Sequence, residues 1–187
     1  MDYRITRGLD LFAGRHDGVE DILRAYVLAS EWLFVALVAI LVIATLVRRG
    51  DLTRSPGILA GASAAIALLI AHFAGSAIAR PRPFVAHHDI HAFIAHAADP
   101  GLPSDHATAA FAIAVAILLA HRVGGLLVLA AACVLAFGRV RLGVHYPTDV
   151  IAGAILGALV ALLVTRVATR LPPLRLPVPQ RARDAKP

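Results

Sequence analysis

The sequence predicts an all-α protein, a polytopic membrane helix bundle with five to six transmembrane helices. Hydrophobic residues make up 59% of the 187 residues, whereas soluble domains contain about 45–50%. Charged residues make up only 16% of the chain, and its mean hydropathy is +0.76. A soluble globule of this composition would expose large apolar patches and aggregate. We therefore expect the excess apolar surface to face lipid.

Five apolar runs have lengths that fit, or nearly fit, the hydrocarbon layer of a bilayer. The predicted spans are Trp32–Val47, Ile58–Ala79, Ala107–Ala120, Leu126–Phe137 and Val150–Val164. The segment before them, Leu9–Leu28, mixes apolar with charged residues. It is expected to form an amphipathic helix or a sixth buried segment.

The basic residues indicate a membrane orientation and a domain boundary. They cluster in the loop 48–54, at 121–122 and after the last span, which five spans place on one side. The positive-inside rule makes this side cytoplasmic. The loops 80–103 and 138–148 then lie on the periplasmic or extracellular face of the inner (plasma) membrane. Residues 1–170 are expected to form one membrane-embedded domain, and the proline-rich, basic residues 171–187 a disordered cytoplasmic tail.

The net charge of +6 does not indicate nucleic-acid binding, because the arginines flank apolar runs rather than forming a basic face. The single cysteine, Cys133, excludes an intrachain disulfide and a cysteine-based metal site. The predicted partners are therefore membrane lipids, and no nucleic acid.

Three polar clusters are expected on the non-cytoplasmic face. In Arg80-Pro81-Arg82-Pro83-Phe84, proline interrupts the helix and holds two guanidinium groups in a rigid turn. A basic helix end is the alternative interpretation. In Pro103-Ser104-Asp105-His106, Ser104 is predicted to be the N-cap of the third span. A helix N-terminus attracts anions, although simple capping would need the same residues.

The third cluster runs from Gly138 to Asp149 and contains Arg139, Arg141 and His145. Pro147 suits the first position of the fifth span, so His145 is expected just outside this helix and Asp149 in its first turn. A carboxylate there can accept a hydrogen bond from one imidazole nitrogen and make the other a better nucleophile. The alternative is that Asp149 only complements the helix dipole.

These clusters resemble the type 2 phosphatidic acid phosphatase superfamily of membrane lipid phosphatases, whose pattern is K-x6-R-P, P-S-G-H and S-R-x5-H-x3-D. The segments R-P-R-P-F, P-S-D-H and G-V-H-Y-P-x-D are most similar to the bacterial undecaprenyl-diphosphate phosphatase branch. Three positions depart from the pattern: Gly75 replaces the lysine, Asp105 the glycine and Gly138 the serine. Arg80 is expected to supply the missing charge.

The resemblance implies hydrolysis of undecaprenyl diphosphate to undecaprenyl phosphate and inorganic phosphate through a phosphohistidine. It implies three catalytic residues: His145 as nucleophile, Asp149 to orient it and His106 as general acid and base. The residues expected around the phosphate are Arg82, Arg139, Ser104, Arg80, Asp105 and Arg141. The Asp105 carboxylate must point away from the phosphate, and Arg141 contacts either a second phosphate or a lipid headgroup. Fixed cations take the place of Mg²⁺, so neither a metal nor a cofactor is expected.

Two other functions remain open. One is a broad lipid phosphate phosphatase that acts on phosphatidylglycerol phosphate or phosphatidic acid. The other is a non-catalytic anionic-lipid binder or transporter, against which the His145 and Asp149 pair argues, because binding alone does not need it.

Two further patterns have a structural and a functional interpretation. His87, His88, His91 and His96 offer metal ligands, but a short interfacial helix with histidines on its wet side is favoured. Gly57-x-x-x-Gly61 and Gly153-x-x-x-Gly157 allow close helix packing, favoured within the chain, with an oligomer as the alternative.

Overall fold

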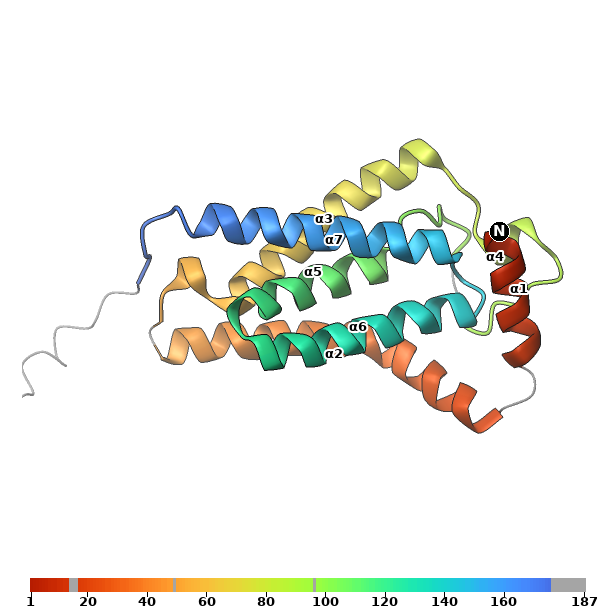
Figure 1. Cartoon of the computed structure of the whole chain (residues 1–187), viewed down its shortest axis with the longest axis horizontal. Coiled ribbons are helices and arrows are strands. Elements are labelled where there is room, and N and C mark those ends of the chain that lie inside the picture. The colour runs from red at the N-terminus through yellow and green to blue at the C-terminus, as the bar shows by residue number, and fades with distance from the viewer. Residues whose placement is uncertain (14–16, 49, 96, 176–187) are drawn as a thin grey trace, which may run out of the picture.

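A computed structural model describes residues 1–13, 17–48, 50–95 and 97–175, and this part of the chain is all-α, as predicted (Figure 1). The helices are α1 (Asp2–Ala13), α2 (Asp17–Val47), the 3₁₀ helix η1 (Leu52–Arg54), α3 (Pro56–Ile78), α4 (Pro83–Ala86), α5 (Asp105–Ala120), α6 (Arg122–Arg141) and α7 (Pro147–Ala168).

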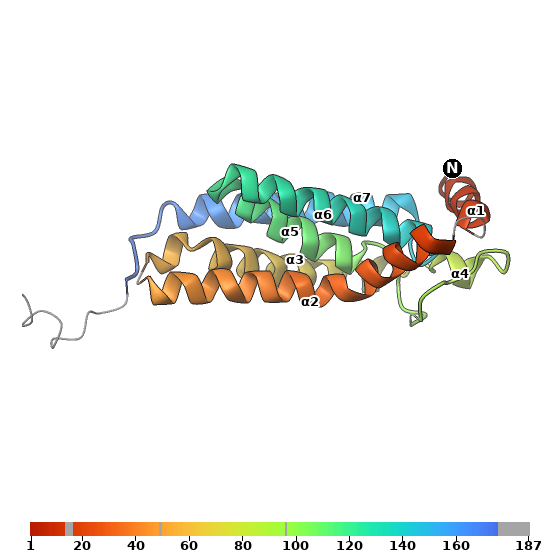
Figure 2. The ribbon, with the colours of Figure 1, turned by 90° about the horizontal axis from the view of Figure 1, so that it is seen from below.

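The five long helices run along the long axis of the molecule, and α5 lies among α3, α6 and α7 (Figures 1 and 2). Alanine dominates the buried face of α5, with Ala107, Ala110, Ala112, Ala114 and Ala116 fully or almost fully buried. Large apolar side chains on the outer helices are exposed, among them Trp32, Phe73, Leu127 and Leu163. This apolar outer surface fits contact with lipid.

Four segments are long and apolar enough to cross a membrane: Gly18–Val47, Pro56–Ala86, Arg122–Arg141 and Pro147–Ala168. Helix α5 is also apolar but has only 16 residues, which correspond to about 24 Å of helix. The prediction of a multi-pass membrane bundle is therefore confirmed for four spans plus this shorter buried helix.

The amino-terminal prediction was wrong in its boundaries. Leu9–Leu28 is divided between two helices, because α1 ends at Ala13 and α2 begins at Asp17. Helix α1 turns away and lies across one end of the bundle (Figure 2). Helix α2 continues without a break to Val47, and its Val27 packs at Gly138 of α6, where an added Cβ would lie 2.5 Å from Val27 Cγ2. This contact explains why glycine stands before Arg139.

The small-residue motifs serve packing within the chain. A Cβ at Gly57 would lie 2.5 Å from the Val42 backbone nitrogen of α2, and a Cβ at Gly157 would lie 2.2 Å from the Thr108 carbonyl oxygen of α5. Both faces are therefore occupied by neighbouring helices, as the favoured interpretation predicted. An oligomer stays a prediction.

The two ends of the bundle differ in what they carry. Helix α1 and the loops that hold the three motifs lie at one end, and η1 and residues 171–175 lie at the other (Figure 1). The Leu174 backbone accepts a hydrogen bond from Leu52 and donates one to Asp51. Residues 176–187 of the predicted tail lie outside the described residues. Arg139 and Arg141 belong to the last turn of α6, not to the predicted loop 138–148, because the helix continues to Arg141.

Candidate active site

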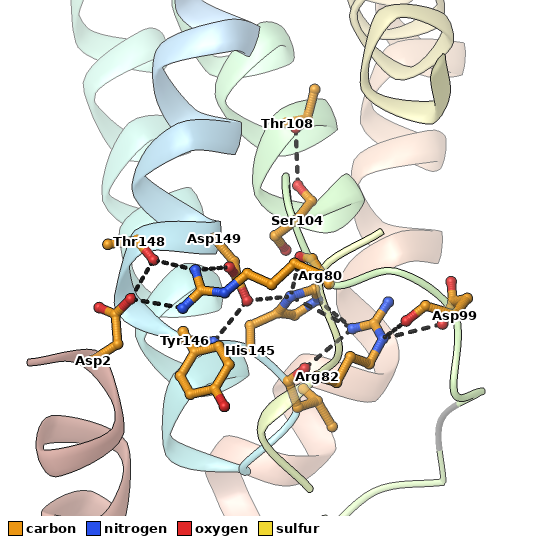
Figure 3. Close-up of polar contacts among 12 residues, drawn as sticks. Asp2, Arg80, Arg82, Asp99, Ser104, Thr108, His145, Tyr146, Thr148 and Asp149 are labelled. Atoms are coloured by element: carbon orange, nitrogen blue, oxygen red, sulfur yellow. Dashed lines mark hydrogen bonds and ion pairs between the residues drawn. The ribbon is translucent and has the colours of Figure 1, made fainter. Parts of the chain in front are cut away.

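The three motifs meet where five helices begin or end (Figure 3). Arg80 and Arg82 lie between α3 and α4, Ser104 precedes α5, Arg139 lies in the last turn of α6, and His145 precedes α7. Backbone hydrogen bonds join these segments: Gly101 donates to the Arg80 carbonyl, and Ser104 donates to the Asp149 carbonyl. The site therefore depends on contacts between segments that are far apart in the sequence.

His145 is 1% exposed and its ring is fixed from both sides. Nδ1 lies 3.0 Å from the Gly101 carbonyl oxygen, and Nε2 lies 2.8 Å from Nη1 of Arg82. A carbonyl only accepts hydrogen bonds, so Nδ1 carries the hydrogen and Nε2 the lone pair. The turn before His145 requires Gly143, which has a φ of +73°.

Asp149 is completely buried in the first turn of α7, as predicted. Its Oδ2 accepts a hydrogen bond of 2.9 Å from the Tyr146 backbone N–H, and its Oδ1 accepts one of 2.9 Å from Arg80. The expected hydrogen bond with the imidazole is replaced by a longer approach, because Oδ2 lies 3.6 Å from Nδ1 of His145. Gly101 accepts the imidazole hydrogen, and Asp149 acts on the ring through its charge.

The guanidinium group of Arg82 is held rigidly at the start of α4. Nε donates to the carbonyl and side-chain oxygens of Asp99, both at 3.1 Å, and Nη1 donates to the Val144 carbonyl. The group is buried and lies against Nε2 of His145. Any group bonded to Nε2 would therefore meet this positive charge.

Arg139 and Ser104 present buried polar atoms without a partner. Arg139 is 3% exposed and Ser104 is 0% exposed. Within the described residues, Nε and Nη2 of Arg139 and the Ser104 hydroxyl have no hydrogen-bond partner. Ser104 is the N-cap of α5 as predicted, yet its hydroxyl does not cap the helix. Buried donors without partners are costly, and an anion with several acceptor oxygens would satisfy them.

Arg80 contacts two carboxylates. Its Nη1 donates to Asp149 at 2.9 Å and to Thr148 at 2.6 Å, and its Nη2 donates to Asp2 of α1 at 2.9 Å. The guanidinium lies over the Tyr146 ring, 4.3 Å from its centroid. Burial raises the pKa of Asp2, but hydrogen bonds from Thr148 and Arg80 outweigh it, and the pKa falls below its ordinary value. Asp2 was not predicted from the sequence, because it belongs to none of the three motifs.

The remaining predicted residues lie around this centre. Nη1 of Arg141 donates to the Leu9 carbonyl of α1 at 2.7 Å, a contact that neither predicted role included. His106 and Asp105 line a mostly apolar cavity of about 250 Å³ between α2, α3 and α5. This cavity joins the polar end of the bundle to its apolar flank.

The histidine-rich loop does not form the favoured interfacial helix, and this prediction was wrong. Helix α4 ends at Ala86, and Ile90 and Ile94 are buried. The Phe93 backbone donates to the Leu142 carbonyl, so the loop packs on the connection between α6 and α7. Among the described residues, no group of three His, Cys, Asp or Glu side chains could hold a metal ion, and His96 lies outside them.

The fold and the site are those of a membrane phosphatase. Residues 56–172 match the PAP2 superfamily, and the chain belongs to it. The undecaprenyl-diphosphatase BcrC of Bacillus subtilis (strain 168) is 31% identical over 173 residues, which cover 92% of this chain and 87% of BcrC.

Two solved structures share the fold. One is a transmembrane PAP2-type phosphatidylglycerolphosphate phosphatase from Bacillus subtilis, with a TM-score of 0.75 and 22% identity over 93% of this chain and 87% of that chain. The other is LpxE of Aquifex aeolicus, with a TM-score of 0.69 and 19% identity over 88% and 94%. The resemblance inferred from the motifs is confirmed at the level of the superfamily.

Proposed function

We propose that this PAP2 phosphatase hydrolyses a polyprenyl diphosphate, undecaprenyl diphosphate, to undecaprenyl phosphate and inorganic phosphate. The observation that carries the proposal is that Arg139 and Ser104 hold buried donors with no hydrogen-bond partner within the described residues, in a chain that also holds Nε2 of His145 against Arg82. Its similarity to an undecaprenyl-diphosphatase over most of both chains supports the choice of substrate.

In the proposed first step, Arg82 transfers its hydrogen bond from Nε2 of His145 to a phosphoryl oxygen, and the freed lone pair on Nε2 attacks the terminal phosphorus in line with the bridging oxygen. The P–N bond forms as the P–O bond to the leaving lipid monophosphate breaks, and His106 donates a proton to that oxygen. Arg82, Arg139, Ser104 and the first amides of α5 bind the equatorial oxygens, where the transition-state charge is concentrated.

In the second step, water cleaves the phosphohistidine. His106 accepts a proton from the water as its oxygen attacks phosphorus, and the P–N bond breaks to restore His145. Asp149 is close enough, at 3.6 Å, to stabilise the positive charge on the imidazole in both steps. The Gly101 carbonyl keeps the hydrogen on Nδ1, so the same nitrogen reacts in each cycle.

A panel of lipid phosphates tests the substrate. We expect purified full-length protein in detergent to release phosphate from undecaprenyl diphosphate with a higher kcat/KM than from phosphatidylglycerol phosphate or phosphatidic acid. The remaining phosphate makes a less basic leaving group than an alkoxide, which lowers the demand on His106. Equal or higher kcat/KM for either phospholipid would favour the broad phosphatase instead, and binding without turnover would favour the lipid-binding alternative.

The same assay tests the proposed independence from metal ions. We expect a chelator to leave kcat unchanged, because fixed guanidinium groups and helix amides supply the positive charge. Vanadate, which adopts a trigonal bipyramid, should inhibit. A loss of activity in chelator that Mg²⁺ or Zn²⁺ restores would contradict the proposed mechanism.

We also propose that α2, α3, α5, α6 and α7 all span the membrane, with the site on the periplasmic or extracellular face. Single cysteines at His91 and Arg54, in a Cys133→Ala background, should then react with an impermeant maleimide from opposite sides of the membrane. His91 and Arg54 are both exposed, so both sites are open to the reagent. Labelling of both from one side would contradict the five-span arrangement.

A further inference from the structure

Helix α1 lies across the end of the bundle that carries the candidate active site (Figure 2). It precedes the residues that match the PAP2 superfamily. Near its end, the Leu9 carbonyl accepts a hydrogen bond from Arg141. Near its start, the Tyr3 hydroxyl donates to Asp89 at 2.6 Å, and Arg7 forms an ion pair with the same carboxylate. These contacts hold α1 between Tyr3 and Leu9, so its first residues have a defined position beside the site.

From this position, the Asp2 carboxylate contacts the guanidinium group of Arg80. Oδ2 of Asp2 accepts hydrogen bonds from Nη2 of Arg80 and from the Thr148 hydroxyl. The other edge of the guanidinium donates to Thr148 and to Asp149. Asp2, Arg80, Asp149 and His145 therefore follow one another in a continuous chain of contacts (Figure 3).

The Arg80 guanidinium is only partly buried, so its orientation depends on the groups to which it donates hydrogen bonds. Arg80 is 28% exposed at its side chain, whereas Asp149 is completely buried, so water competes for Arg80 but not for Asp149. A planar guanidinium that donates to two carboxylates keeps one orientation. Asp2 also shares the positive charge of Arg80, which leaves Asp149 with more negative charge to stabilise the imidazolium of His145.

We propose that Asp2 is a positioning residue. From α1 it fixes the orientation of Arg80 against Asp149, and it thereby strengthens the stabilisation of the His145 imidazolium by the Asp149 carboxylate. This inference rests on the proposed function, in which His145 becomes positively charged during each cycle. Burial raises the pKa of Asp2, but hydrogen bonds from Thr148 and Arg80 lower it below its ordinary value, which agrees with a charged carboxylate paired with Arg80. Asp2 does not touch the substrate.

The test compares Asp2→Asn with Asp21→Asn, a matched change at an exposed residue of α2, in full-length protein with a carboxyl-terminal tag. With undecaprenyl diphosphate, Asp2→Asn should lower kcat by about 3- to 30-fold, which lies within the range of coupling between residues in one hydrogen-bond network. KM should stay within about twofold, because the lost interaction acts in the transition state. Asp2→Glu, which retains the carboxylate, should recover part of the rate, and Asp21→Asn should match the wild type.

A double-mutant cycle separates positioning from a purely structural role. In an Arg80→Ala background, Asp2→Asn should cause no further loss of kcat, because Asp2 acts through Arg80. An equal loss in both backgrounds, a wild-type kcat for Asp2→Asn, or a loss that only follows the folded fraction measured by thermal unfolding would overturn the inference. A wild-type chain that cleaves no lipid phosphate would overturn the proposed function itself, which distinguishes the two failures.

Discussion

Replacement of His145 by alanine is expected to lower kcat for phosphate release by at least about 10⁴-fold, as the loss of a nucleophile does in other covalent enzymes. The imidazole of His145 is held at both ring nitrogens, by Gly101 at Nδ1 and Arg82 at Nε2. The alanine side chain has no nucleophilic atom, so His145→Ala cannot form a phosphoenzyme at this position. The measurement is phosphate release from undecaprenyl diphosphate under saturating substrate.

The control is His88→Ala, which removes an exposed histidine from the same end of the molecule and should leave kcat unchanged. Brief incubation with labelled substrate should trap an acid-labile, base-stable phosphoenzyme in the wild type but not in His145→Ala. His145→Gln, which retains polar atoms near Gly101 and Arg82, guards against a folding defect. Phosphoenzyme formation in a folded His145 variant would assign the nucleophile to another residue.

The sequence was sufficient to propose a candidate site because the polar residues concerned lie in short motifs at helix ends. Pro147 marks the start of α7, which places His145 just before the helix and Asp149 in its first turn. Proline after Arg82 and Ser104 before Asp105 mark two further helix starts. Since helices that cross a membrane alternate in direction, these starts meet at one end of the bundle.

The details that the sequence did not predict depend on contacts without a motif. The Gly101 carbonyl, which accepts the Nδ1 hydrogen of His145, is a backbone group that any residue would offer. Asp2 and Arg80 are 78 positions apart in the chain, and α1 resembles many charged amphipathic helices. Gly138 departs from the serine of the family pattern, and the structure shows that it admits Val27 of α2. Packing between distant elements decided each of these features.

Arg139→Met is expected to lower kcat/KM strongly without a loss of stability. Charge-assisted hydrogen bonds are worth about 1.5–3 kcal/mol each, so each bond lost to the phosphoryl group lowers kcat/KM by roughly 10- to 150-fold. Arg139 offers two nitrogens, Nε and Nη2, that have no partner within the described residues. Because these nitrogens make no hydrogen bond within the described residues, burial of their charge is unfavourable.

Arg139→Met should therefore lower kcat/KM while it leaves stability unchanged or raises it. A structural role for Arg139 would instead lower both. Thermal unfolding of Arg139→Met in detergent should occur at the wild-type temperature or above it, because methionine fills a similar volume without a buried charge. Vanadate should raise the unfolding temperature of the wild type, since it binds only the folded site, and should raise that of the variant less. A variant that loses both activity and stability would show that Arg139 holds the helices together, and the unpartnered donors would then no longer indicate a phosphate site.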